Sequence, residues 1–172
     1  MTRLEGLKAR YLLLSLAVVV LDQWSKWLVE ARLADHMPFV VVPGFLNLIY
    51  VKNTGVAFGM FAAHGNPWGW LILALLGIAA LALVSFVFWR TPTEDRLLLT
   101  ALALIMGGAV GNLIDRVANK AVTDFIDAYF RSYHWHTFNV ADSAITIGIC
   151  LMAIDMLFGR KQPAEAPSKS SH

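Results

Sequence analysis

Four long runs of apolar residues alternate with more polar stretches along this chain of 172 residues. The runs cover about 11–29, 68–89, 97–114 and 138–158. At a rise of roughly 1.5 Å per residue, each run is long enough to cross the roughly 30 Å hydrocarbon core of a bilayer as an α-helix. The pattern therefore predicts an α-helical integral membrane protein, with four transmembrane helices in a single membrane-embedded domain, 1–159.

The segment between the first two runs has a different pattern. VVVPGFLNLIYVKN is rich in β-branched and aromatic residues and is broken by Pro43–Gly44, which is typical of short strands or a hairpin. The next residues, NTGVAFG (53–59), are apolar but too short to span a membrane, so we expect a short interfacial helix or a partly re-entrant turn there. The polar end of the chain, 160–172, is expected to be a disordered cytoplasmic tail.

Composition and charge agree with a membrane protein and indicate its orientation. The chain is 58% hydrophobic and only 15% charged, with a net charge of +2, whereas soluble domains carry roughly 25% charged residues. Such a small basic excess does not favour nucleic-acid binding. The two chain ends and the second loop together hold eight basic residues: Arg3, Lys8, Arg10, Arg90, Arg96, Arg160, Lys161 and Lys169. The first and third loops hold five: Arg32, Lys52, Arg116, Lys120 and Arg131. Both termini are therefore expected to be cytoplasmic.

Several polar residues fall at one depth of the predicted bundle. With the termini inside, the outer boundary of the membrane receives nine of them: Asp22, Lys26, Asn53, Asn112, Asp115, Arg116, Asp124, Asn139 and Asp142. An ionisable side chain in a spanning segment costs a few kcal/mol on insertion scales, so each one requires an explanation. We expect these residues to form one polar site near the outer surface.

Structural explanations compete with a functional one for part of this set. Asp22 and Lys26 are four residues apart and can neutralise one another on one helix face. Asp115 and Arg116 can form a charge pair at a helix end. These four residues are therefore candidates for a supporting role as much as for a chemical one.

Other features have structural explanations as well. Gly107 and Gly111 form a GxxxG motif, which favours close packing of helices. His134 and His136 have no nearby cysteine or glutamate cluster, so no metal site is predicted. Cys150 is the only cysteine, which excludes an internal disulfide, and we expect it to be a buried small residue of the last helix.

Asp124 and Asp142 are the strongest candidates for chemistry. Asn139 can be the N-cap of the last helix, but a cap does not explain Asp142 three residues further in. Two carboxylates held close together share a proton, so one can activate water while the other polarises a scissile carbonyl. The residues alone leave a hydrolytic dyad and a structural or transport role as alternatives.

Five blocks of the sequence resemble a known family. They are DQWSK (22–26), NTGVAFG (53–59), GGAVGNLIDR (107–116), VTDFID (122–127) and FNVADSAI (138–145). In this order, and across all four predicted spans, they resemble the lipoprotein signal peptidases (signal peptidase II, peptidase family A8), which are aspartyl proteases of the bacterial inner membrane. The resemblance implies a small extracytoplasmic β-cradle and a periplasmic helix beside the four spans.

The resemblance also implies an activity and a set of site residues. It implies cleavage of prolipoproteins on the amino side of a diacylglyceryl-modified cysteine, in contact with membrane lipids, without metal or cofactor, and with inhibition by globomycin-type cyclic peptides. Asp124 and Asp142 match the catalytic pair. The substrate-binding or supporting positions are matched by Asn53, Gly55, Asn112, Asp115, Arg116, Asn139, Ala141, Asp22 and Lys26. The site is expected to face the periplasm.

Two functions of other classes are alternatives to this one. A proton-coupled small membrane transporter could use Asp22, Asp124 and Asp142 as a relay. Transporter sites lie near the membrane midplane between repeated halves, whereas this chain shows no internal repeat and its carboxylates lie to one side. A non-catalytic membrane scaffold or sensor would need its carboxylates for assembly rather than for turnover.

Overall fold

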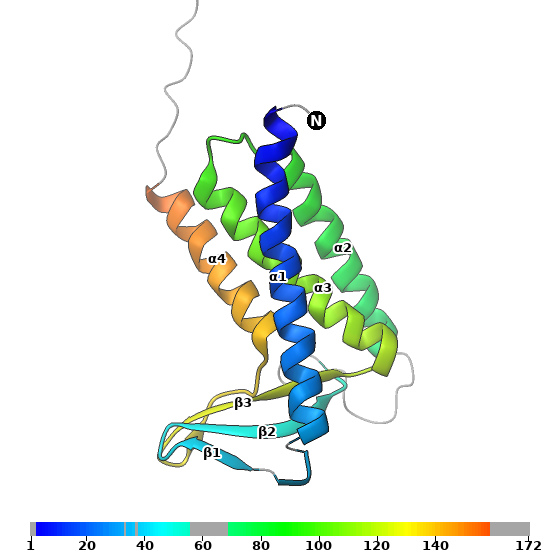
Figure 1. The fold of residues 1–172 in the computed structure, drawn as a ribbon, viewed down its shortest axis with the longest axis vertical. Coiled ribbons are helices and arrows are strands. Elements are labelled where there is room, and N and C mark those ends of the chain that lie inside the picture. The colour runs from blue at the N-terminus through cyan, green and yellow to red at the C-terminus, as the bar shows by residue number, and fades with distance from the viewer. Residues whose placement is uncertain (1–2, 33, 37, 56–68, 159–172) are drawn as a thin grey trace, which may run out of the picture.

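The computed structural model of the protein describes residues 3–32, 34–36, 38–55 and 69–158 (Figure 1). Within these residues, four helices are long and apolar enough to cross a membrane. The helices and strands follow in the order α1 (Arg3–Arg32), η1 (Ala34–His36), β1 (Phe39–Val42), β2 (Leu46–Asn53), α2 (Gly69–Arg90), α3 (Arg96–Asn119), β3 (Val122–Phe130), β4 (Tyr133–His134) and α4 (Val140–Phe158). The predicted architecture of four helices with a small antiparallel sheet is confirmed.

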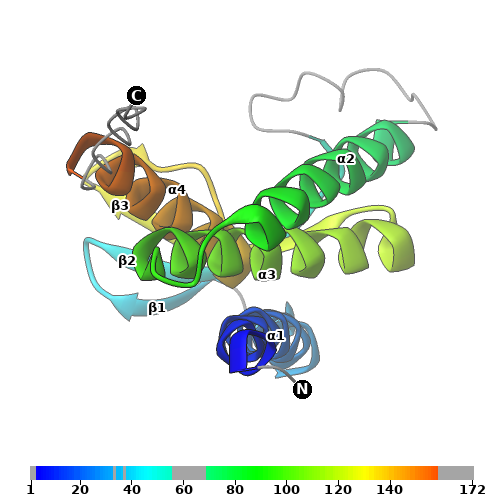
Figure 2. The same ribbon diagram turned by 90° about the horizontal axis from the view of Figure 1, so that it is seen from above.

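Helix α3 is at the centre of the bundle and packs against α1, α2 and α4 (Figure 2). Its small residues permit the close approach. A Cβ atom at Gly107 would lie only 2.7 Å from the Ser15 carbonyl oxygen of α1, and one at Gly111 only 2.6 Å from the Asp22 carboxylate. The GxxxG motif is therefore a packing surface for α1, as predicted.

Two helices extend beyond the predicted spans. Helix α1 begins at Arg3 and ends at Arg32, and α3 continues to Asn119 before Lys120 (φ 58°) ends it in a left-handed conformation. Asn112, Asp115 and Arg116 consequently lie within the last turns of α3 rather than at its end. Their side chains are thereby fixed relative to the bundle.

The outer surface of the bundle is apolar, as expected for contact with lipid. Leu13, Leu83 and Phe86 are each more than half exposed, and such large apolar patches mark a membrane-contacting surface. Cys150 also belongs to this surface. It is exposed, so the expectation that it is buried was wrong: it lies on a face of α4 that no described helix covers.

The antiparallel sheet lies at one end of the bundle, below the helices in Figure 1, in the order β1-β2-β3-β4. Strands β1 and β2 form the hairpin predicted around Pro43–Gly44. Strand β3 was not predicted. It pairs with β2 along its length, with Asp124 opposite Val51, so Asp124 lies on a strand rather than in a loop.

Two expectations fall outside the described residues. The interfacial helix expected in NTGVAFG involves residues 56–59, and the disordered tail covers 160–172. Both stay predictions.

Candidate active site

Asp142 lies in the first turn of α4, and Asn139 fixes its backbone. The Asn139 side-chain oxygen accepts a hydrogen bond from the Asp142 N–H (2.9 Å). The backbone carbonyl oxygen of Asn139 accepts another from the Ser143 N–H (3.1 Å). In return, the Asp142 carboxylate accepts a bond from the Asn139 N–H (3.3 Å). Asn139 is thus the N-cap, as predicted, in a reciprocal arrangement that resembles a capping box.

Asp124 is held by side chains from two other elements. Asn53, the last residue of β2, donates to its Oδ2 at 2.9 Å, and Asn139 donates to its Oδ1 at 2.8 Å. The Gly55 N–H in turn donates to the Asn53 Oδ1 at 3.0 Å. Asp124 is only 2% exposed. Its burial raises the pKa of the carboxyl group, and the nearby charge of Asp142 raises it as well. The two amide hydrogen bonds lower this pKa, but the burial outweighs them.

Asp124 and Asp142 line one cavity of about 530 Å³ between the sheet and the adjacent ends of α3 and α4. Asn139 contacts both carboxylates, and Asn112 of α3 donates to the Asp142 Oδ1 at 2.7 Å. The two acidic residues, which are 18 positions apart in the sequence, are therefore brought to a common site by β3 and the start of α4. The lining comprises Asn53, Gly55, Asn112, Arg116, Val122, Asp124, Trp135, His136, Thr137, Phe138, Asp142, Ser143, Thr146 and Ile147.

A buried charge network supports the site from behind. The Lys26 ammonium group contacts the Asp22 carboxylate at 2.7 Å and the Asp115 carboxylate at 2.8 Å, and it donates to the Asn112 Oδ1 at 3.2 Å. All four residues are buried. Because Lys26 fixes the Asn112 oxygen, the Asn112 amide nitrogen is directed at Asp142. None of the three charged residues lines the cavity, which agrees with a supporting role.

Ala141, which was predicted as a substrate-binding or supporting residue, does not line the cavity. It is fully buried, and its N–H donates to the Asp22 Oδ1 at 2.9 Å. A Cβ atom at Gly111 would lie 3.4 Å from the Ala141 Cβ, which shows how closely α3 and α4 approach here. Ala141 therefore connects the charge network to the first turn of α4.

Arg116 brings a positive charge to the cavity wall. Its guanidinium group is half-buried, and its Nη1 donates to the Asn112 carbonyl oxygen at 3.4 Å. A guanidinium group presents several donors in a fixed plane, which suits it to hold a carbonyl or ester oxygen of a bound molecule.

The sequence did not indicate every residue of the network. Gln23 donates to the Asp115 Oδ1 at 2.9 Å and to the Gly111 carbonyl oxygen at 3.1 Å, and the Thr123 N–H donates to the Asp115 Oδ2 at 3.2 Å. The position of Gln23 next to Asp22 could have indicated that Gln23 belongs to the network. Nothing in the sequence indicated the Thr123 contact, because it depends on the pairing of β3.

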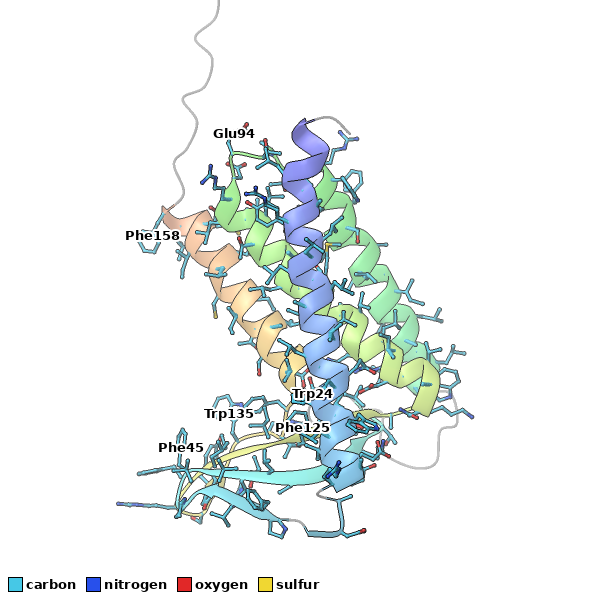
Figure 3. The ribbon with its side chains drawn as sticks, viewed as in Figure 1. Trp24, Phe45, Glu94, Phe125, Trp135 and Phe158 are labelled. Atoms are coloured by element: carbon cyan, nitrogen blue, oxygen red, sulfur yellow. The ribbon has the colours of Figure 1, made fainter. Side chains whose placement is uncertain are left out.

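Part of the cavity wall was also not predicted. Ser143, Thr146 and Ile147 continue from Asp142 along one face of α4, at the helical spacing that could have indicated them. Trp135, which Figure 3 shows between the sheet and α4, also lines the cavity.

No group of three or more histidine, cysteine, aspartate or glutamate residues in the described part of the chain could hold a metal ion. His134 instead pairs with Asp127 at 2.8 Å. The cavity is lined by two carboxylates, two asparagines and one arginine, together with His136 and three hydroxyl side chains.

The fold and the site define a multi-pass membrane protein with a paired-carboxylate site at one end of its helices. The sequence profile described as "Signal peptidase (SPase) II" matches residues 14–158. The chain belongs to the signal peptidase II family.

Individual relatives agree with this assignment. The lipoprotein signal peptidase of Solibacter usitatus is 44% identical over 147 residues, which cover 86% of this chain and 90% of the relative. That of Acinetobacter baylyi is 42% identical over 151 residues, 87% of this chain and 82% of the relative. A solved structure, described as a bacterial membrane enzyme studied by the in meso method at 2.3 Å, is 31% identical with a TM-score of 0.78. The match covers 92% of this chain and 94% of that one.

Proposed function

We propose that the protein is an aspartic endopeptidase that removes signal peptides from prolipoproteins, cleaving on the amino side of a diacylglyceryl-modified cysteine. The observation that carries the proposal is the shared cavity of Asp124 and Asp142 in a member of the signal peptidase II family. The relatives named lipoprotein signal peptidase support the substrate class. Neither metal nor cofactor is part of the proposal.

The surroundings of the two carboxylates support different protonation states. Burial raises the pKa of Asp124, which favours the protonated form of its carboxyl group. Asp142 accepts hydrogen bonds from the Asn112 side chain and the Asn139 backbone and lies in the first turn of α4, where the helix dipole stabilises an anion. For the proposed reaction we therefore assign the negative charge of the pair to Asp142.

The proposed reaction follows from these states. Ionised Asp142 takes a proton from a water molecule, whose oxygen attacks the scissile carbonyl carbon, while Asp124 gives its proton to the carbonyl oxygen. The tetrahedral intermediate returns a proton to Asp124 as the carbonyl re-forms, and Asp142 delivers its proton to the leaving amine. Both carboxyl groups end the cycle as they began.

The placement of the cavity supports a substrate that arrives within the bilayer. The cavity continues from the sheet along α4 to Thr146 and Ile147, and Ile147 is 53% exposed on the surface of the bundle. A signal-peptide helix in the membrane could thus present its scissile bond at the carboxylates while its acyl chains stay in lipid. Asn53, Gly55 and Arg116 would hold backbone or ester oxygens in the reacting position.

The proposal includes a location. The protein is placed in the bacterial inner membrane with both termini cytoplasmic and the sheet, the cavity and the carboxylates on the periplasmic side. Globomycin-type cyclic peptides are expected to occupy the cavity and to inhibit cleavage. A transport function is not favoured, because the carboxylates lie at one end of the helices rather than near the midplane.

The direct test is cleavage by the purified protein in detergent or nanodiscs. A prolipoprotein peptide with a diacylglyceryl-modified cysteine should be cut on the amino side of that cysteine, and mass spectrometry of both products locates the bond. The same peptide without the lipid should be cut far more slowly, because it lacks the anchor that holds it in the membrane. Failure to cut the lipidated peptide would overturn the proposed function.

A further inference from the structure

Asp127 is a buried carboxylate of β3 that does not line the cavity. It is 4% exposed. The His134 Nδ1 lies 2.8 Å from its Oδ1 and 3.0 Å from its Oδ2, and the Asn47 amide donates to its Oδ2 at 3.2 Å. A carboxylate this deeply buried depends on such partners, because its desolvation is costly without them.

Neither member of the pair is among the residues that line the cavity. Asp127 follows Asp124 by three residues on β3, and the pairing of β3 with β2 is irregular between them. His134 shares the face of Asp127, because it pairs with Tyr129 across the strands, and their rings stack with centroids 5.0 Å apart. The pair therefore lies outside the cavity that holds Asp124 and Asp142.

His134 nevertheless precedes the part of the chain that forms one wall of the cavity. Residues 135–138 all line the cavity, and we call them the outer wall. The outer wall is attached to β3 by backbone hydrogen bonds near its two ends. The Trp135 N–H donates to Ala128 O (2.8 Å), and Phe138 exchanges two bonds with Ile126 (2.9 and 3.2 Å).

Few other contacts fix the entry to the outer wall. Strand β4 has only two residues, Tyr133 and His134, and so short a strand contributes little by itself. The turn before it is strained, since Arg131 has φ 58°. Among the described residues, the His134 side chain attaches β4 to β3 here, through its contacts with Asp127 and Tyr129.

We propose that Asp127 and His134 are a positioning pair, which holds the outer wall in the geometry that binds substrate. The proposal rests on the proposed peptidase function and adds a determinant of substrate affinity to it. Asp124 and Asp142 keep their own partners, Asn53, Asn112 and Asn139, when the pair is broken. Loss of the pair should therefore weaken binding and leave the chemical step nearly unchanged.

The test compares three variants with the wild-type protein, using the diacylglyceryl-modified peptide. His134→Ala removes the pair. His134→Asn keeps a donor, because its Nδ2 takes the place of the imidazole Nδ1. Tyr133→Ala is the matched control: this neighbour in β4 is 67% exposed and does not line the cavity. KM and kcat are measured for each, together with backbone hydrogen exchange of the outer wall by mass spectrometry.

His134→Ala should raise KM about tenfold while kcat changes by less than about twofold, since a charge-assisted hydrogen bond that serves binding is lost. Hydrogen exchange in the outer wall should become faster, with the helices unaffected. His134→Asn should restore most of the affinity and the protection, and Tyr133→Ala should behave as wild type.

Other results would overturn the proposal. A fall in kcat without a rise in KM, or no rescue by His134→Asn, would contradict a positioning role in binding. If hydrogen exchange of the outer wall in His134→Ala equals that of the wild-type protein, the pair does not hold the outer wall, whatever the activity of the variant. A wild-type protein that never cuts the lipidated peptide would instead overturn the peptidase function, and the role in substrate binding with it.

Discussion

At the scale of single residues, Asn139 has the most connected role in the site. Its side chain donates to Asp124 and accepts from the Asp142 N–H, while its own N–H donates to the Asp142 carboxylate. Asn139 is fully buried. One asparagine thus starts α4, orients one carboxylate and stabilises the other, so the distance between the two acids is set by the beginning of a helix.

Asn53 is expected to set the alkaline limit of activity. Its hydrogen bond lowers the pKa of Asp124, against the burial that raises it. Asn53→Ala should therefore raise this pKa further. In the proposed reaction Asp124 acts in its protonated form, so activity should be lost as pH rises through that pKa, and the alkaline limb of kcat/KM should move to higher pH. A pH profile of the purified variant measures this. An alkaline limb that stays in place or moves to lower pH would contradict the assigned protonation states.

Lys26 is expected to be essential for stability. Lys26→Met leaves Asp22 and Asp115 buried without a cation, which costs about 3–5 kcal/mol in comparable buried pairs. Thermal unfolding should show a clearly lower Tm, and Asp115→Asn in the same chain should recover part of the loss. The control is Lys52→Met, which breaks an exposed pair with Glu30 worth less than about 1 kcal/mol. Equal Tm values for the two single variants would count against the network.

The sequence predicted which residues form the site better than how they are connected. The depth of Asp22, Lys26 and Asp142 followed from their positions in the apolar runs. The contact of Asn53 with Asp124 did not, because it needs the register between β2 and β3. Ala141 was expected as a substrate-binding or supporting residue, and the sequence did not show that its N–H would donate to Asp22 behind the cavity. Contacts between distant segments are set by packing, which one sequence does not show.

At the scale of elements, long apolar runs were predictable and short strands only in part. The β1–β2 hairpin has a clear turn signal at Pro43–Gly44. VTDFIDAYF, which forms β3, lacks the regular alternation of a half-exposed strand, because its first residues are buried on both faces. Cys150 illustrates the converse problem. An all-round apolar helix such as α4 does not show which of its faces meets lipid.

The contact between α1 and α3 should be sensitive to a single methyl group. Gly107→Ala places a Cβ 2.7 Å from Ser15 O and 2.8 Å from Val18 Cβ, so the helices must separate, at a cost of about 1–3 kcal/mol. Gly77→Ala is the matched control, since its nearest neighbour is Leu113 Cδ1 at 4.0 Å. Thermal unfolding should give a lower Tm for Gly107→Ala alone. Equal Tm values would show that the α1–α3 contact can relax without cost.

At the scale of the whole molecule, the sheet and the turn between α2 and α3 lie at opposite ends of the bundle, as Figure 3 shows for Trp135 and Glu94. In a Cys150→Ala background, a membrane-impermeant maleimide should label Tyr133→Cys in intact spheroplasts. It should reach Glu94→Cys only after permeabilisation, because we propose that this end faces the cytoplasm. The reverse pattern would contradict the proposed orientation.

The proposed mechanism depends most on the shared chemistry of two carboxylates, Asp124 and Asp142. The most direct test is cleavage of a diacylglyceryl-modified prolipoprotein peptide by purified Asp124→Asn and Asp142→Asn, each shown by thermal unfolding to be folded. Asp35→Asn, which changes an exposed acid of η1, is the control. We predict that both variants lose cleavage by at least about a thousandfold while the control stays active, because each carboxyl group carries a proton in the reaction. Near-wild-type turnover by either folded variant would contradict the dyad.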